Sequence, residues 1–341
     1  SRKNNPKQML KIASDLSLYQ TAIQRLEGIF PPERILVVTV EDQAVQLKEQ
    51  VPAIPAENFL IEPMPRGTAS VIGYAAIALK NLDPNAVMAV LTADHLIEDV
   101  AKFQDLLVAA YQAAKAGNLV TLGIEPTHPA TGYGYIQQGD FDQQYNGFDA
   151  YQVLKFKEKP DLERAQEMLV SQDHAWNSGM FFWSVDQITS EFHRQMPILA
   201  ESLDKITAVW NSPDRDMVIS EVWPAIVPET IDYGIMENAE KVVVIPAKAL
   251  GWNDIGSWDA LYDVLKSDDD GNIVMSGEIL PYNSKNVLAL EGMKDKLIVT
   301  IGVDDLVVID TPDVLLVCKK QDSQSVRDIV KRLNNEKSKF I

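Results

Sequence analysis

The chain has 341 residues, of which 46% are hydrophobic and 23% are charged. These ordinary globular values allow a large packed core, and the length suits two domains. The formal net charge of −18 argues against general affinity for nucleic acid or for an anionic membrane surface. The single cysteine, Cys318, leaves no intrachain disulfide and is typical of a reducing compartment, so we expect a cytoplasmic location. No apolar run approaches the roughly 20 residues that span a membrane.

The first part of the chain alternates predicted strands and helices. Apolar runs at residues 35–40, 86–91 and 119–124 predict buried strands. Between them we expect helices that begin at Thr68 and at Asp99, each acting as an N-cap. This order predicts parallel strands with right-handed crossovers. We therefore expect an α/β fold with a Rossmann-like domain, in which a mixed, mainly parallel sheet carries helices on both faces.

The chain changes character near residues 268–271, where three aspartates and a glycine predict a linker with a turn. Short β-type runs follow at 286–290, 296–301, 306–309 and 314–318, with an amphipathic helix at 325–333. Strands spaced by about 8–12 residues predict an all-β module, which could be a sandwich, a barrel or a β-helix. We expect one domain over residues 1–267 and a second, small β domain over residues 268–341.

Asp94 follows the predicted strand at residues 86–91. Ligands of open α/β sheets bind outside the carboxyl ends of the strands, and a carboxylate near phosphates suits Mg²⁺. An aspartate after a strand can equally cap a helix or a turn. Asp254 lies between a predicted strand at 242–245 and a helix that Ser257 would cap, so it is a candidate to share the same ion.

Lys7 and Lys159 each lie next to a proline that limits loop motion, and both are candidates for phosphate contacts. A solvated surface charge is the alternative for each of them. We find no pairing of a nucleophile with a base in the sequence. Nucleotidyl transfer needs none, because it depends mainly on positioning and on charge neutralisation.

Three further sites have the chemistry to bind a nucleotide or a sugar. Asn177 offers a side-chain amide to sugar hydroxyls, and Gly132 leaves a backbone N–H exposed. Arg66 and Gly67, next to the predicted helix N-terminus at Thr68, form a candidate site for an anion or a base edge. A simple connecting loop is the alternative for this last segment.

A series of short motifs follows along the chain. They are Glu62-Pro63…Arg66-Gly67-Thr68-Ala69, Leu91-Thr92-Ala93-Asp94-His95, Gly132-Tyr133-Gly134-Tyr135-Ile136, Phe156-Lys157-Glu158-Lys159-Pro160, Trp176-Asn177-Ser178-Gly179-Met180-Phe181, Ile231-Asp232-Tyr233 and Trp252-Asn253-Asp254-Ile255-Gly256-Ser257-Trp258. In this order they make the chain resemble the mannose-1-phosphate guanylyltransferases (GDP-mannose pyrophosphorylases) over essentially its whole length. The resemblance implies a sugar nucleotidyltransferase fold and an enzyme that transfers GMP from GTP to mannose 1-phosphate. A sugar-phosphate oxygen would attack the α-phosphorus of GTP in line, and pyrophosphate would leave.

The resemblance also implies roles for individual residues. Asp94 and Asp254 would hold Mg²⁺, Lys7 would act with them as a catalytic residue, and Lys159 would bind the sugar phosphate. The positions left for substrate binding are Gly132, Glu158 and Asn177 for the mannose, with Asp232 nearby, and Arg66, Gly67 and Thr68 for the guanine.

The family's glycine-rich signature, G-G-x-G-T-R-L-x-P-L-S-R followed by P-K, is represented here only by Ser1-Arg2 and Pro6-Lys7. We therefore expect the first strand and the phosphate loop to belong upstream of Ser1. Arg2 would be part of that loop, which holds the triphosphate through its backbone N–H groups and its arginine. The β tail resembles the short left-handed β-helix of these enzymes, which implies a homodimer.

Other functions remain open at this point. One is a pyrophosphorylase that makes a different nucleotide sugar, and the segment from Arg66 to Ala69 together with the short tail argues against it. The other is a non-catalytic relative that senses nucleotide sugars. The presence of Asp94, Lys159 and Asp254 together argues against a sensor, because a sensor has no need of metal-binding carboxylates.

Overall fold

The computed structural model describes residues 6–12, 14–256, 258, 260–290, 296–336 and 340. Its contacts divide the chain into two compact units. One unit consists of residues 1–22, 93–96 and 253–341, and the other of residues 23–92 and 97–252.

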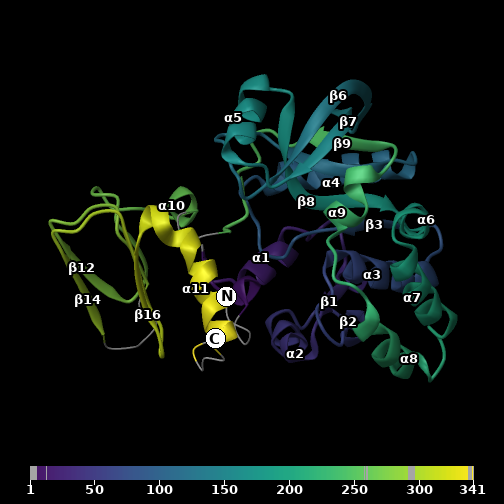
Figure 1. Ribbon diagram of the computed structural model, residues 1–341, viewed down its shortest axis with the longest axis horizontal. Coiled ribbons are helices and arrows are strands. Elements are labelled where there is room, and N and C mark those ends of the chain that lie inside the picture. The colour runs from purple at the N-terminus through teal and green to yellow at the C-terminus, as the bar shows by residue number, and fades with distance from the viewer. Residues whose placement is uncertain are drawn as a thin grey trace. The chain divides into compact units, whose positions relative to one another are not determined.

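The elements follow one another along the described residues as helices and strands of both units (Figure 1). The helices are α1 (Leu18–Gln24), α2 (Glu41–Gln50), α3 (Thr68–Leu82), α4 (Val100–Lys115), α5 (Leu162–Ser171), α6 (Val185–Gln195), α7 (Pro197–Ala208), α8 (Arg215–Val222), α9 (Ile231–Gly234), α10 (Leu261–Val264) and α11 (Val326–Asn335). The strands are β1 (Val37–Thr39), β2 (Phe59–Ile61), β3 (Val87–Val90), β4 (Leu96–Ile97), β5 (Leu119–Ile124), β6 (Gly134–Tyr145), β7 (Phe148–Glu158), β8 (His174–Ser184), β9 (Val242–Pro246), β10 (Trp252–Asn253), β11 (Ile273–Ser276), β12 (Glu278–Tyr282), β13 (Leu288–Leu290), β14 (Leu297–Ile301), β15 (Leu306–Asp310) and β16 (Leu315–Lys319). Within the described part of the chain, no helix is both long enough and apolar enough to cross a membrane.

The larger unit is built on a six-stranded sheet in the order β3-β8-β5-β9-β7-β6. The expectation of a mainly parallel sheet is wrong here, because β5 and β9 pair in parallel whereas the other neighbours are antiparallel. The physical reason is β8, which follows the long β6–β7 hairpin and inserts between β3 and β5, antiparallel to both. β1 and β2 form a separate parallel pair, as the β-α-β order predicts.

Alternating side chains of this sheet face two apolar cores, one on each face. On β8, Phe181 and Trp183 belong to the core formed with α3, α6 and α7, which lie together in Figure 1. Met180 and Phe182 belong to the core formed with α4. This alternation is the period of a strand covered on both faces, so helices do flank both faces of the sheet as expected.

The two expected helix starts differ. The Asp99 carboxylate accepts the backbone N–H of Lys102 at 3.0 Å and caps α4, as the sequence predicts. Thr68 is instead the first residue of α3, and Gly67 takes the cap position with φ 84°. The expectation that Thr68 caps its own helix is wrong, because its hydroxyl accepts the backbone N–H of Ile231 at 2.9 Å.

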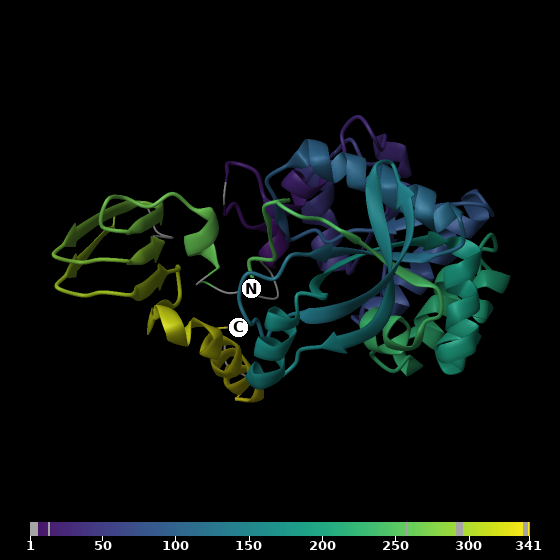
Figure 2. The ribbon, with the colours of Figure 1, turned by 90° about the horizontal axis from the view of Figure 1, so that it is seen from above.

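The β-rich part of the other unit stacks its strands in parallel layers. β11, β13 and β15 pair in parallel, with Ile273 opposite Leu288 and Leu288 opposite Val307, and β12 pairs in parallel with β14. Figure 2 shows these green and yellow-green strands stacked above one another. Of the three expected architectures, this is a β-helix-like one, closed by the antiparallel β16. The sequence analysis missed β11 and β12, because Gly277 and Pro281 interrupt their apolar pattern.

Candidate active site

Three predicted residues meet in the unit formed by residues 1–22, 93–96 and 253–341. The Lys7 ammonium donates to Asp94 Oδ2 at 2.9 Å and also donates to the backbone carbonyl of Asp254. Asp94 lies in the bend between β3 and β4, so it does not serve as a helix cap. Lys7 is half-buried in this contact. It is therefore not the solvated surface charge that the sequence left open.

The turn that carries Asp254 is tightly specified. The backbone N–H of Gly256 donates to Asp254 Oδ1 at 2.9 Å, and that of Ile255 donates to Asn253 Oδ1 at 2.8 Å. Ile255 has φ 44°, which is unusual for a β-branched residue. Its buried side chain packs in the same core as Leu261 and the β-helix strands. Strained backbone of this kind persists where the surroundings determine it, and it gathers at functional sites.

The donor set at this cluster suits Mg²⁺. That ion takes hard oxygen ligands, usually one or two carboxylates, and completes its shell with water and substrate phosphates. Asp94 and Asp254 both lie in segments held by Lys7, and they offer two such carboxylates. Within the described residues, no group of three or more His, Cys, Asp or Glu side chains is placed to hold a metal ion. An ion here would therefore depend on substrate oxygens as well.

A second cluster lies in the unit formed by residues 23–92 and 97–252. Asn177 on β8 donates from Nδ2 to Asp232 Oδ1 on α9 at 2.8 Å. At the end of β7, the Lys159 ammonium donates to the Glu158 carboxylate. A Cβ added at Gly134 would collide with Glu158 Oε2, so the glycine makes room for that carboxylate. The structure thus brings together the residues expected at the sugar phosphate.

A β-bulge aims Asn177 into this cluster. Thr121 on β5 lies opposite Phe181 on β8 whereas Gly123 lies opposite Asn177, so β8 carries extra residues between these pairs. Gly179 has φ 69° within the bulge, and its N–H donates to Asn177 Oδ1 at 3.1 Å. Bulges often redirect a side chain beside an active site. The Asn-Ser-Gly sequence therefore has a structural purpose besides its polar chemistry.

The charges of the second cluster perturb one another. Burial and the neighbouring Glu158 charge raise the pKa of Asp232 to about 6, against the weaker effects of the Asn177 hydrogen bond and the Lys159 charge. Burial lowers the pKa of Lys159, but the hydrogen bond and charge of Glu158, with the charge of Asp232, outweigh burial and raise that pKa. Lys159 is therefore a firmly charged cation beside two carboxylates.

The segment expected at the guanine is bonded to the residues just before Asp232. Glu229 donates its N–H to the Arg66 carbonyl at 3.2 Å, and Ile231 donates to the Thr68 hydroxyl. A Cβ at Gly67 would collide with the Glu229 carbonyl, and its φ of 84° also favours glycine. The two segments therefore form one joint.

The side chains beside this joint differ from the expectation in one respect. The Arg66 guanidinium donates to the backbone carbonyl of Pro224, so protein already holds it. Glu62, at the end of β2, is only 8% exposed, and its Oε2 has no hydrogen-bond partner among the described residues. Burial raises the pKa of Glu62, against a hydrogen bond from the Arg66 backbone. The sequence analysis assigned Glu62 no role, although an acid directly before a proline at a strand end was the available signal.

Two predicted residues remain without described contacts to these clusters. Gly132 is exposed, and no atom lies within 4 Å of a Cβ built on it, so its backbone is accessible. Next to it, the Tyr133 ring packs against Trp176 and Trp252 with centroids 4.9 Å and 5.4 Å away. Arg2 lies outside the described residues, as does the expected helix cap Ser257.

Comparisons with known proteins agree along the whole chain. The family model described as nucleotidyl transferase matches residues 1–271, and that of the MannoseP isomerase/GMP-like beta-helix domain matches residues 283–333. The chain is 36% identical to a mannose-1-phosphate guanylyltransferase of Klebsiella pneumoniae, over 100% of this chain and 72% of the relative. It is 38% identical to the mannose-1-phosphate guanylyltransferase ManC of Salmonella typhimurium, over 98% of this chain and 69% of the relative. A crystal structure titled mannose-1-phosphate geranyltransferase, from Thermus thermophilus, superposes with a TM-score of 0.86 at 30% identity, covering 98% of this chain and 94% of that one.

Proposed function

We propose, because the chain belongs to the nucleotidyl transferase family and within it to the mannose-1-phosphate guanylyltransferases, that it transfers GMP from GTP to mannose 1-phosphate. The products would be GDP-mannose and pyrophosphate. The observation that carries the proposal is the match over the whole chain, which includes the residues of both clusters. The grouping of Lys7, Asp94 and Asp254 around one ammonium supports it.

The chemistry proposed for this chain is positioning and charge neutralisation. A phosphate oxygen of mannose 1-phosphate forms a bond to the α-phosphorus of GTP, and the bond from that phosphorus to the bridging oxygen breaks to release pyrophosphate. The attacking oxygen is already anionic, so no general base is required. Asp94 and Asp254 would hold Mg²⁺, which neutralises charge on the triphosphate when it is bound. Lys7 adds a cation and keeps both aspartate segments in place.

The second cluster is proposed to bind the sugar phosphate. Lys159 is charged and exposed enough to exchange its contact with Glu158 for a phosphate. Asn177 can donate to a sugar hydroxyl, while Glu158 and Asp232 can accept from sugar hydroxyls. This arrangement suits a ligand that combines a phosphate dianion with several hydroxyl groups.

Recognition of the guanine is proposed for Arg66, Gly67 and Thr68, and Glu62 is a further candidate. The buried carboxylate of Glu62 has an unpartnered oxygen next to the Arg66 backbone. A buried carboxylate oxygen without a donor is costly, and a ligand with N–H donors would satisfy it. Guanine presents such donors on its base edge, whereas uracil offers only one.

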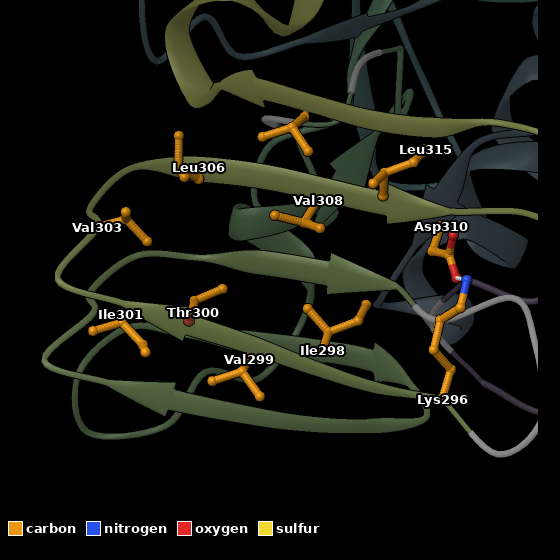
Figure 3. A pocket seen from close by; sticks show the side chains of 11 residues that line it. Lys296, Ile298, Val299, Thr300, Ile301, Val303, Leu306, Val308, Asp310 and Leu315 are labelled. Carbon is orange, nitrogen blue, oxygen red and sulfur yellow. Dashed lines mark hydrogen bonds and ion pairs between the residues drawn. The ribbon is translucent and has the colours of Figure 1, made fainter.

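We also infer that the β domain is a short left-handed β-helix through which two copies form a homodimer. Its support is an exposed apolar groove of about 490 Å³ between β14 and β16. Figure 3 shows Ile298 and Val308 in this groove and the Lys296–Asp310 ion pair at one end. Paired sheet edges with apolar side chains are a common way to cover such a surface. The division at residues 267 and 268, the Rossmann-like arrangement and the cytoplasmic location stay predictions.

A nucleotide screen tests the proposed function. The protein is incubated with mannose 1-phosphate, Mg²⁺ and each of GTP, ATP, UTP and dTTP, and pyrophosphate release is followed. We expect release with GTP alone. Release with another nucleotide would contradict the assignment of the base, and nucleotide binding without any release would indicate the sensor.

One variant connects this activity to the first cluster. We expect Asp94→Asn to lower kcat by about 100-fold or more, since it removes a negative ligand at the triphosphate. Asp186→Asn is the matched control, because Asp186 forms an exposed ion pair with Lys80 on the surface of α6 and α3. Equal activities of the two variants would remove Asp94 from the reaction.

A further inference from the structure

We propose that Thr121 is a positioning residue of the sugar-phosphate cluster, whose hydroxyl holds the side-chain amide of Asn177 so that its N–H faces a mannose hydroxyl. This inference rests on the function proposed above and assigns a role to a residue outside every motif noted in the sequence.

Thr121 is a polar residue in an otherwise apolar strand. It is 0% exposed in the middle of β5, opposite Phe181 of β8 on one side and Val244 of β9 on the other. A buried hydroxyl costs free energy unless it is hydrogen-bonded, and valine has nearly the same shape without that cost. The hydroxyl of Thr121 donates to Asn177 Oδ1 at 3.3 Å. Its retention in a buried strand is thus explained by Asn177.

The hydrogen bonds of Asn177 leave only one orientation for its amide. The oxygen accepts from the Gly179 N–H and from the Thr121 hydroxyl, and the nitrogen donates to Asp232. A backbone N–H can only donate, so it must face the amide oxygen. The second hydrogen on Nδ2 has no partner among the described residues, and Asn177 is half-buried. That hydrogen is placed to donate to a ligand oxygen.

Thr121 contributes something that Gly179 does not. Gly179 lies two residues from Asn177 within the same bulge, so its hydrogen bond moves with the bulge. Thr121 belongs to the neighbouring strand and ties the amide to the sheet itself. Without it, the amide keeps one bond to its oxygen and gains freedom to rotate. We expect this freedom to weaken sugar binding rather than the chemical step.

The first experiment compares Thr121→Val with Thr121→Ser. We expect the valine variant to raise KM for mannose 1-phosphate by about 3- to 10-fold, the effect of one neutral hydrogen bond. Its kcat and its KM for GTP should stay within about twofold of wild type. The serine variant keeps the donor and should restore KM. Thr189→Val is the matched control, because that hydroxyl bonds only the Val185 carbonyl of its own helix.

A second experiment separates positioning from a general packing defect. The valine and wild-type proteins are compared with mannose 1-phosphate analogues that each lack one hydroxyl. With the analogue that lacks the hydroxyl bound by Asn177, the two proteins should have the same KM, and with the other analogues the difference should persist. An equal penalty with every analogue, or an unchanged KM with mannose 1-phosphate itself, would overturn the proposal.

The outcomes also remain separable from those of the proposed function. Wild-type protein that releases no pyrophosphate from GTP and mannose 1-phosphate would contradict the function before any variant is compared. If the valine variant does not fold, Thr121→Cys replaces it, since a thiol is only a weak donor. An intermediate KM for that variant, between serine and the 3- to 10-fold value, supports the proposal, and a wild-type KM contradicts it.

Discussion

At the scale of single residues, the sugar-phosphate cluster combines an unfavourable charge with a strained backbone. Asp232 is buried beside Glu158, and only Asn177 and Lys159 offset this. Lys159 itself has φ 45°, and Gly179 has φ 69°. A ligand that offers hydroxyl groups and a phosphate would relieve part of this unfavourable arrangement. Such pre-organisation is characteristic of a binding site rather than of a structural core.

The raised pKa of Asp232 predicts a pH dependence of stability. Its pKa is 3.8 ordinarily and about 6 in the folded protein, so the favourable protonated form is fully present below about pH 4 and is lost as the pH rises through about 6. Asp232→Asn removes this loss. Relative to wild type, the variant should therefore gain up to about 3 kcal/mol in free energy of unfolding between about pH 4 and pH 8. Urea unfolding at both pH values measures this gain, and the same difference at both would contradict it.

Gly179→Ala should affect both stability and sugar binding. A side chain at φ 69° costs about 1–2 kcal/mol, and the shifted bulge misplaces Asn177. Gly147→Ala is the matched control, since Gly147 has φ 81° in the open β6–β7 turn with no atom near its Cβ position. We expect similar losses in thermal unfolding but a raised KM for mannose 1-phosphate only at Gly179. A raised KM in both variants would argue against the bulge.

At the scale of elements, the start of α3 and the residues before α9 form one joint. The Thr68 hydroxyl and the Arg66 carbonyl accept backbone N–H groups from Ile231 and Glu229, and α9 then carries Asp232 to Asn177. The segment expected at the guanine is therefore connected through backbone bonds to a residue expected near the mannose. A disturbance of the joint should reach both substrates.

Gly67→Ala tests this joint. The added Cβ would collide with the Glu229 carbonyl and would take a φ of 84°, so we expect a loss of about 2–4 kcal/mol. Gly117→Ala, at the end of α4, has φ 94° but open space, and should lose only the conformational part. Thermal unfolding of the two variants, with KM for both substrates, provides the comparison. A joint without functional importance would leave both KM values unchanged in a folded Gly67 variant.

At the scale of the whole molecule, the chain forms two units with separate cores, and each carries part of the predicted site. Lys7, Asp94 and Asp254 belong to one unit, whereas Asn177 and Asp232 belong to the other. The β-helix part also exposes apolar side chains on β14 and β16. Large exposed apolar surfaces of this kind usually bind another protein surface.

Positive charges introduced on this surface test the proposed homodimer. We expect Val299→Lys combined with Val317→Lys to convert a dimer into a monomer, because burial of two new ammonium groups is unfavourable. Val274→Lys is the control, since Val274 is exposed on β11 but does not line the groove. Sedimentation velocity measures the molecular mass in each case. A double variant that remains dimeric would place the dimer contact elsewhere.

Sequence reasoning was most successful where the signal is local. The apolar run at residues 119–124 is β5 itself, and Asp99 caps α4, because strand burial and helix capping depend on neighbouring residues. The candidate residues were also identifiable by their chemistry and by the order of their motifs. Lys7 in particular was recognised as a candidate, although its alternative as a surface charge stayed open.

The tertiary structure decided what depends on distant segments. The position of β8 between β3 and β5, the contact of Lys7 with a residue 247 positions away, and the use of Thr68 by Ile231 leave no trace in local periodicity. Thr121 and Glu62 gain their importance only from burial and from the partners that folding supplies or withholds. The sequence by itself therefore determined the elements, the family and the chemical groups, because these depend on residue type and short-range order. Pairing, burial and the final hydrogen-bond partners required the folded chain, because they arise from contacts between segments that are far apart in sequence.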